Sequence, residues 1–190
     1  MENKIAIIGL GYVGLPLALE VAQHYQVVGF DVSESRIAEL KKGNDLTKEV
    51  SNEVIESAIN DNLTVTSDEA MLFDANIFII TVPTPVDKNN NPDFSPLTSA
   101  SELVGRHMAK DDYVIYESTV YPGATEEVCV PILEAISGMS LNVDFHVGFS
   151  PERINPGDKV NTLTSIKKVT SGSTESAANF IDGLYRSIIT

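Results

Sequence analysis

Residues 4–14 read KIAIIGLGYVG, an apolar, β-branched run that leads directly into three glycines with the spacing Gly-x-Gly-x-x-Gly. The apolar run predicts a strand buried on both faces, and the pattern that follows it predicts a helix. A glycine-rich turn between a strand and a helix is the context in which this motif binds a dinucleotide. Gly9 permits the tight turn, Gly11 leaves room for a pyrophosphate, and Gly14 allows close packing of helix and strand.

Four further residues extend this turn into a predicted dinucleotide site. We expect the N–H groups of Tyr12 and Val13, at the positive end of the first helix, to bind the pyrophosphate. Asp31 follows the second predicted strand, about 20 residues after the second glycine, where a carboxylate accepts hydrogen bonds from the adenosine ribose. This carboxylate would repel a 2′-phosphate, so NAD is expected rather than NADP. A nearby arginine can accommodate that phosphate, but beside Asp31 we expect Arg36 to pack along the adenosine.

Short β-branched runs alternate with amphipathic stretches along the whole chain. This alternation predicts an α/β fold, a Rossmann-like doubly wound and mostly parallel sheet with helices on both faces. We expect one domain over residues 1–190. The predicted strands are Lys4–Ile8, Gln26–Phe30, Leu63–Thr66, Asn76–Val82, Tyr113–Glu117, Phe145–Phe149 and Ile166–Thr170. The predicted helices are Val13–His24, Glu34–Lys42, Asn52–Asn60, Pro96–Ala109, Ala124–Ser137 with a kink or break at Pro131, and Ser176–Ile189.

Charge and composition exclude several classes of partner. The net charge of −14 argues against a nucleic-acid or anionic-membrane surface, because both need clustered Lys and Arg. No apolar run has the length of a membrane span, and the start of the chain does not resemble a signal peptide. The single cysteine excludes an internal disulfide and a cysteine-based metal cluster, and we expect no metal site. A cytoplasmic location fits these observations.

Three polar clusters follow predicted strands, at the sheet edge where open parallel sheets bind ligands. Residues 81–85, TVPTP, present the hydroxyl of Thr84 between two prolines, and residues 117–123, ESTVYPG, place Ser118 and Thr119 at the same edge. Residues 149–157, FSPERINPG, add Glu152 and Arg153. Taken singly, the first cluster is also typical of an ordinary proline-rich strand exit, and the last of a surface ion pair.

Together these clusters resemble the UDP-glucose/GDP-mannose dehydrogenase family, in particular its UDP-N-acetylhexosamine branch. The resemblance rests on an ordered set of motifs that spans nearly the whole chain. They are GLGYVGLP at 9–16, PTP at 83–85, STV at 118–120 with PG at 122–123, SPER at 150–153 and NPG at 155–157. Members of this family oxidise the C6 alcohol of a nucleotide sugar to a carboxylate in two NAD-dependent steps, through a cysteine-bound thiohemiacetal and a thioester.

The resemblance implies a role for each matching residue. Tyr12, Val13, Asp31, Arg36, Thr84, Ser118 and Thr119 would line the NAD site. Thr119 would lie near the nicotinamide and the catalytic water. Glu152 would assist thioester hydrolysis, a role that suits a carboxylate whose pKa is raised in a closed pocket. Arg153 and Ile154 would contact the UDP-sugar.

The family's nucleophilic cysteine lies in a later segment, so we expect this chain to be the amino-terminal part of a longer protein. The resemblance also implies that the longer protein is a homodimer. Cys129 lies among apolar neighbours and carboxylates, which indicates a buried thiol of the core. Residues 1–190 alone are therefore expected to bind NAD without oxidising a nucleotide sugar. Two alternatives remain from the residues alone, a hydroxyacid or 6-phosphogluconate type of dehydrogenase on the same scaffold and a non-enzymatic NAD-sensing module.

Overall fold

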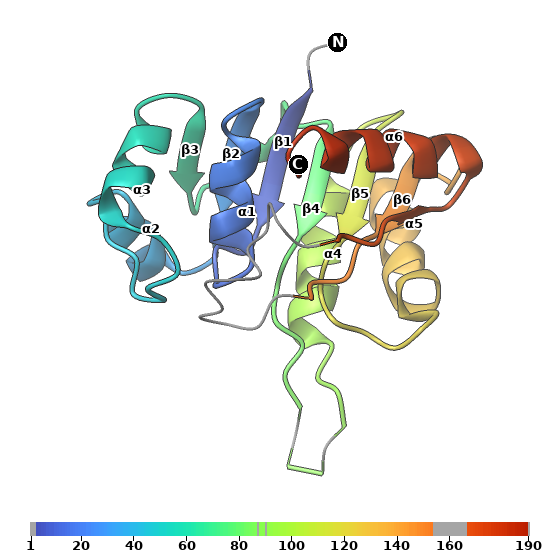
Figure 1. Ribbon diagram of the computed structural model, residues 1–190. Coiled ribbons are helices and arrows are strands. Elements are labelled where there is room, and N and C mark those ends of the chain that lie inside the picture. Colours follow the sequence, from blue (N-terminus) through green and yellow to red (C-terminus); the bar gives the residue numbers. More distant parts are fainter. Residues whose placement is uncertain (1–2, 87, 90, 154–166, 190) are drawn as a thin grey trace.

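A sheet of seven strands runs through the middle of the described part of the chain (Figure 1). The structure is a computed structural model that describes residues 3–86, 88–89, 91–153 and 167–189. The strand order across the sheet is β3-β2-β1-β4-β5-β6-β7, with every pair parallel except β6 and β7. The strands are β1 (Lys4–Ile8), β2 (Gln26–Phe30), β3 (Leu63–Thr66), β4 (Ile77–Ile80), β5 (Tyr113–Tyr116), β6 (His146–Phe149) and β7 (Ser171–Gly172).

Helices cover both faces of this sheet, with α1 and α6 on one face and α4 and α5 on the other (Figure 1). The α-helices are α1 (Gly14–Val21), α2 (Glu34–Leu40), α3 (Asn52–Ile59), α4 (Ser95–His107), α5 (Val130–Ser137) and α6 (Glu175–Arg186). A short 3-10 helix, η1 (Glu69–Leu72), follows β3. None of the helices in the described ranges combines the length and the apolarity that crossing a bilayer requires.

The alternation of side chains along each strand builds two separate apolar cores. In β1, Ile5 and Ile7 pack in the core beneath α1 and α6, whereas Ala6 and Ile8 pack in the core beneath α4 and α5. All four side chains are almost fully buried. A strand buried on both faces must be apolar throughout, which is why the run predicted from residues 4–8 has no polar position after Lys4.

The chain reverses its direction across the sheet at β1. It runs outward from β1 to β2 and β3, and then returns to place β4 on the other side of β1. The connections that leave β1 and β4 therefore diverge, and ligands of doubly wound sheets bind in the crevice between two such connections. This crevice lies at the carboxyl ends of the strands, the lower edge in Figure 1, where the loop between β4 and α4 also extends outward.

The predicted strand Ile166–Thr170 is wrong. Within its described part, residues 167–170 form no strand, and the pairing to β6 is made instead by Ser171 and Gly172, in the antiparallel direction. Close packing explains the position of this strand, because a Cβ atom at Gly172 would lie 2.3 Å from the backbone nitrogen of Ala178 in α6. The prediction of a mostly parallel sheet is confirmed.

The expected disturbance at Pro131 takes the form of a wide turn. Thr125–Cys129 forms a π-helical turn, η2, which leads directly into α5 with Pro131 in its first turn. Proline has no N–H group and its ring collides with the carbonyl one turn earlier, so a widened turn before it lets the helix continue. The helix ends at Ser137, as predicted, and Gly138 caps it with the positive φ of 71° that glycine tolerates.

Candidate functional site

One cavity of about 930 Å³ lies at the carboxyl edge of the sheet, in the size range of small-molecule sites. Its walls come from the segments that follow β1, β2, β4, β5 and β6. The cavity brings together most of the residues predicted from the sequence, namely Gly9, Gly11, Tyr12, Val13, Asp31, Thr84, Ser118, Thr119, Glu152 and Arg153. Gly14 and Arg36 do not line it, and Ile154 lies outside the described residues.

The three glycines of the turn have three different surroundings. Gly9 has a φ of 98°, a conformation that other residues rarely adopt. A Cβ atom at Gly14 would lie 1.8 Å from the carbonyl oxygen of Gly9, so only glycine allows α1 to start this close to β1. A Cβ atom at Gly11 would meet no protein atom within 4 Å. The space in front of Gly11 is therefore open on the cavity side, as an approaching pyrophosphate requires.

The start of α1 offers donors to that space. No side chain caps the helix at Val13. Within the described residues, the backbone N–H groups of Gly11, Tyr12 and Val13 donate to no backbone acceptor. Unsatisfied N–H groups at a helix start carry partial positive charge and bind phosphate oxygens. This geometry fits the diphosphate of a dinucleotide.

Thr81, at the end of β4, fixes the turn from the neighbouring strand. Its hydroxyl Oγ1 lies 2.7 Å from the carbonyl oxygen of Gly9 and donates a hydrogen bond to it. The same hydroxyl lies 3.1 Å from the carbonyl oxygen of Ile8. These hydrogen bonds join the end of β4 to the end of β1, directly beneath the glycine turn.

Asp31, which follows β2, is hydrogen-bonded to the same glycine turn. Its Oδ2 atom accepts a hydrogen bond from the N–H of Leu10 at 2.8 Å, and its Oδ1 atom accepts one from the N–H of Ser33 at 2.9 Å. Each carboxylate oxygen has a further lone pair, and the residue lines the cavity. Asp31 can therefore hold the turn and still accept hydrogen bonds from ribose hydroxyls.

Arg36 lies behind the turn rather than in the cavity. Its Nε atom donates to the carbonyl oxygen of Leu10 at 2.9 Å, and its Nη2 atom pairs with Asp45 at 2.8 Å. Burial acts to raise the pKa of Asp45, but hydrogen bonds from Thr47 and the Arg36 charge outweigh it and lower that pKa. Two of the three guanidinium nitrogens, Nε and Nη2, have these partners, and a direct contact between Arg36 and the adenosine stays a prediction.

The exits of β4 and β5 are joined by two hydrogen bonds. Thr84 donates its hydroxyl hydrogen to the carbonyl oxygen of Thr119 at 2.7 Å, and Ser118 donates to the carbonyl oxygen of Val82 at 2.6 Å. The oxygens of Thr84 and Ser118 remain able to accept hydrogen bonds from a ligand. The side chain of Thr119 is exposed at the cavity, as a role beside the reacting atoms requires.

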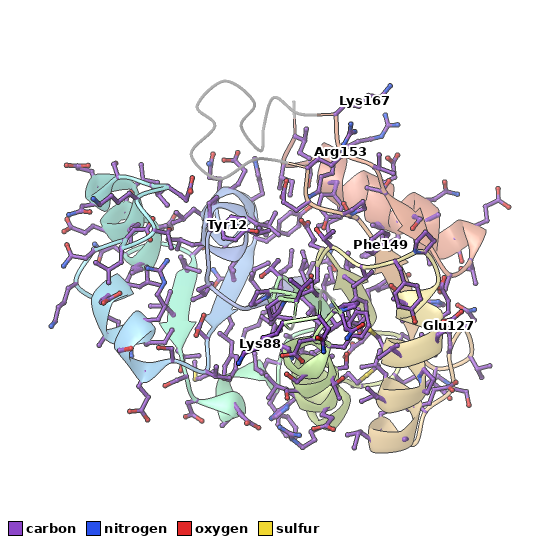
Figure 2. All side chains as sticks on the ribbon, turned by 90° about the horizontal axis from the view of Figure 1, so that it is seen from below. Tyr12, Lys88, Glu127, Phe149, Arg153 and Lys167 are labelled. Atoms are coloured by element: carbon purple, nitrogen blue, oxygen red, sulfur yellow. The ribbon has the colours of Figure 1, made fainter. Side chains whose placement is uncertain are left out.

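Two carboxylates and a lysine meet at the end of the cavity nearest β6. Glu117 is buried at the end of β5, and its Oε2 atom lies 2.6 Å from Nζ of Lys168. The same Nζ lies 3.4 Å from Oε2 of Glu152. Figure 2 looks onto this edge and shows Arg153 beside Lys167, whose carbonyl oxygen accepts a hydrogen bond from the guanidinium at 3.0 Å.

Cys129 is a core residue, as predicted. Its side chain is 1% exposed, and burial raises the pKa of its thiol. A buried thiol that resists ionisation is a poor nucleophile. In the described ranges no three His, Cys, Asp or Glu side chains gather in a way that could hold a metal ion.

The sequence of the chain places this site in a known family. Residues 3–189 match the NAD-binding domain of the UDP-glucose/GDP-mannose dehydrogenase family. The chain belongs to this family. The family match shows that the domain is an NAD-binding domain, and it confirms the resemblance drawn from the motifs. The match also excludes the alternative that the chain is the Rossmann domain of a hydroxyacid or 6-phosphogluconate type of dehydrogenase.

Relatives in the UDP-glucose/GDP-mannose dehydrogenase family are longer than this chain. It is 56% identical over 189 residues to a UDP-N-acetyl-D-glucosamine 6-dehydrogenase of Pseudomonas aeruginosa, covering 100% of the chain and 44% of the relative. It is 51% identical over 190 residues to Protein CapL of Staphylococcus aureus, with the same coverage. A solved UDP-D-ManNAc dehydrogenase from Pyrococcus horikoshii, 36% identical, superposes with a TM-score of 0.91 over 98% of this chain and 45% of that structure. The chain thus spans less than half of each relative.

Several residues that line the cavity or contact its lining have no role predicted from the sequence. Lys168 lies outside the motifs, and Thr81 lies in the 81–85 cluster, where a role is predicted for Thr84 and none for Thr81. Glu117 does have a signal, since it ends a predicted strand that is otherwise apolar, and a charge in that position needs a partner. Its partners are Lys168 and Tyr185, whose phenol donates a hydrogen bond to Oε1.

Proposed function

We propose that the protein containing this chain oxidises the C6 alcohol of a UDP-sugar to a carboxylate in two NAD-dependent steps. UDP-N-acetylhexosamine is the proposed substrate, and precursors of cell-surface polysaccharide are the proposed products. Residues 1–190 act as the NAD-binding domain. The proposal is supported by family membership and by the 56% identity to a relative named UDP-N-acetyl-D-glucosamine 6-dehydrogenase.

The observation that carries this proposal is the composition of the cavity. The glycine turn that suits a pyrophosphate and the side chains of Thr119 and Glu152 line the same space. NAD, when bound there, accepts the hydride removed from C6. The four-electron oxidation of an alcohol to a carboxylate releases two hydrides, and it needs one water molecule and a group that takes the proton of that water.

Glu152 is the proposed acceptor of that proton. In the hydrolytic step, the water oxygen forms a bond to the thioester carbonyl carbon as Glu152 takes a proton from the water. The carbon–sulfur bond then breaks, and the thiolate leaves with the proton that Glu152 returns. The carboxylate is mostly buried at the cavity wall, where a base is in reach of a bound acyl group. Thr119 is proposed to orient the water.

Turnover by the full-length protein tests the proposal. We expect two NADH molecules per molecule of UDP-N-acetylglucosamine or UDP-N-acetylgalactosamine consumed, measured by absorbance and by mass spectrometry of the uronic acid product. A single NADH per sugar, with an aldehyde or ketone product, would contradict the four-electron reaction. No NADH from any UDP-sugar would overturn the proposal and favour the NAD-sensing module.

The 190-residue chain by itself provides a second test. Its single thiol, Cys129, is buried, so the chain is proposed to bind NAD without producing NADH. NAD should raise its melting temperature, and NADP should not. NADH formation from a UDP-sugar by the purified chain would show that the thiol is not buried or that no thiol is needed.

A cytoplasmic homodimer is the proposed form of the whole protein. The resemblance to the family supports the homodimer, and a thiol left free of disulfides suits a reducing compartment. Light scattering on the full-length protein checks the dimer, and cell fractionation checks the compartment.

A further inference from the structure

A buried lysine stands between the proposed base and a second carboxylate that the proposed function does not use. Nζ of Lys168 is 2.6 Å from Glu117 and 3.4 Å from Glu152. The side chain of Lys168 is 3% exposed, that of Glu117 is 0% exposed, and that of Glu152 is 11% exposed. The three charges therefore interact with little screening by water.

Burial makes the pairing of Lys168 with Glu117 obligatory. An ammonium or a carboxylate that is removed from water without a partner is strongly destabilised. Glu117 meets this requirement with two donors, since Tyr185 of α6 donates to Oε1 and Lys168 donates to Oε2. The ammonium also lies 5.6 Å from the centre of the Tyr185 ring. These contacts fix the ammonium in front of Glu152.

The effect of Lys168 on proton uptake by Glu152 depends on the combined charge of Lys168 and Glu117. Lys168 alone would hold Glu152 ionised and make it a weak acceptor of protons, because an opposite charge favours the ionised form. With Glu117 present, the lysine charge is already neutralised. The group of three carries one net negative charge while Glu152 is ionised and none after it takes a proton, so proton uptake relieves the charge of the buried group.

We propose that Lys168 is a positioning residue for Glu152, and that Glu117 neutralises Lys168 so that Glu152 remains able to accept a proton during hydrolysis. This inference rests on the proposed function, because it assigns the surroundings of the proposed base. Glu117 and Lys168 act through Glu152 and need not touch the substrate.

Few other titratable groups of the described chain face this group. Tyr185 lies behind Glu117, and burial keeps its pKa well above the ordinary value, so it stays neutral. Arg153 follows Glu152 in the chain, but its guanidinium donates to the carbonyl oxygen of Lys167. Asp182 of α6 accepts from Thr170 and pairs with Arg186, away from Glu152. Within the described part of the chain, the charges closest to Glu152 are therefore those of Lys168 and Glu117.

The test uses the full-length protein with NAD and a UDP-N-acetylhexosamine. Samples are quenched with acid during the first turnover, and mass spectrometry follows the decay of the covalent sugar adduct as a function of pH. Lys168→Met removes the positive charge, so the acid-side midpoint of the decay rate should move up by about one pH unit. Glu117→Gln removes the negative charge, so that midpoint should move down by about one pH unit.

Opposite displacements distinguish this proposal from a merely structural role, which would slow decay in both variants without moving the midpoints apart. Lys168→Arg retains the charge and should restore the wild-type midpoint. Melting temperature and NAD affinity, measured for each variant, identify misfolding. Should Glu117→Gln fail to fold, the comparison of Lys168→Met with Lys168→Arg decides.

Two negative results have different meanings. A wild-type protein that forms neither an adduct nor NADH overturns the proposed function and this inference with it. A wild-type protein that forms and hydrolyses the adduct, with midpoints unchanged in Lys168→Met and Glu117→Gln, overturns the inference and leaves the proposed function standing.

Discussion

The carboxylate of Asp31 accepts a hydrogen bond from the backbone N–H of Leu10, at 2.8 Å between Oδ2 and N. Leu10 lies between the first two glycines of the turn, so the residue proposed to hold the ribose also holds the segment proposed to approach the pyrophosphate. The two halves of the proposed NAD contact are thus connected inside the protein before any ligand binds. This connection reduces the ordering that binding requires.

Asp31→Ala should therefore weaken NAD binding and also lower the melting temperature. Loss of charge-assisted hydrogen bonds to the ribose should cost about 1.5–3 kcal/mol of binding free energy, measured by calorimetry. Asp68→Ala is the matched control, because Asp68 accepts from the N–H of Ala70 in η1 and does not line the cavity. Unchanged NAD affinity in Asp31→Ala would count against the assignment of Asp31.

Alanine at two glycines of the turn should have different consequences, one for stability and the other for NAD binding. Gly14→Ala places a Cβ atom 1.8 Å from the carbonyl oxygen of Gly9 and should cost about 1–3 kcal/mol of unfolding free energy. Gly11→Ala meets no protein atom and should melt like the wild type, but the rise in melting temperature caused by NAD should disappear. A full NAD response in Gly11→Ala would show that the pyrophosphate lies elsewhere.

Asp45→Asn should destabilise the protein at neutral pH, because it removes the carboxylate 2.8 Å from the Arg36 guanidinium and leaves Glu39, at 4.0 Å, as the remaining ionic partner among the described residues. The folded-state pKa of Asp45 is lowered from its ordinary 3.8, so its contribution is complete above that value and is lost as the pH falls through the lower one. The difference in unfolding free energy between wild type and variant should be largest at neutral pH and shrink in acid. A constant difference across denaturation curves at several pH values would contradict this.

Asp112→Asn should stabilise the protein at neutral pH. Burial raises the pKa of Asp112 from 3.8 to about 6, so the folded state binds the proton more tightly and loses stability as the pH rises across that window. Asparagine keeps an acceptor for the N–H of Ala109, which lies 2.6 Å from the carboxylate, and removes the buried charge. Thermal unfolding should show a gain on the order of 1 kcal/mol at pH 8 that vanishes near pH 4. A loss of stability at pH 8 would refute it.

Local sequence patterns predicted the parts of the fold in which one segment determines its own structure. The bounds of β1, β2 and β3 agree with their predictions at both ends, because short apolar runs between polar turns leave little choice of register. Ser33, directly before the predicted helix, caps α2 by accepting a hydrogen bond from the N–H of Arg36. Ser51 has no such bond at α3, since the same residue type caps a helix only where its side chain turns toward the N–H groups.

The parts that escaped prediction depend on residues far apart in the chain. Glu117 meets Lys168 across 51 positions and Tyr185 across 68 positions, and no spacing rule connects them. The pairing of Arg36 with Asp45 is likewise not visible in the sequence, whereas the contact of Arg36 with the adenosine stays a prediction. The short β7 forms where α6 comes close to Gly172, a packing contact that strand propensity does not describe.

The paired bonds from Thr84 to Thr119 and from Ser118 to Val82 limit how the cavity can open. The residues that follow β4 are hydrogen-bonded to those that follow β5. Neither segment can therefore move outward alone without breaking both bonds. The two strand exits are therefore expected to move as one unit, so that the part of the cavity wall they form keeps its shape when a ligand enters or leaves.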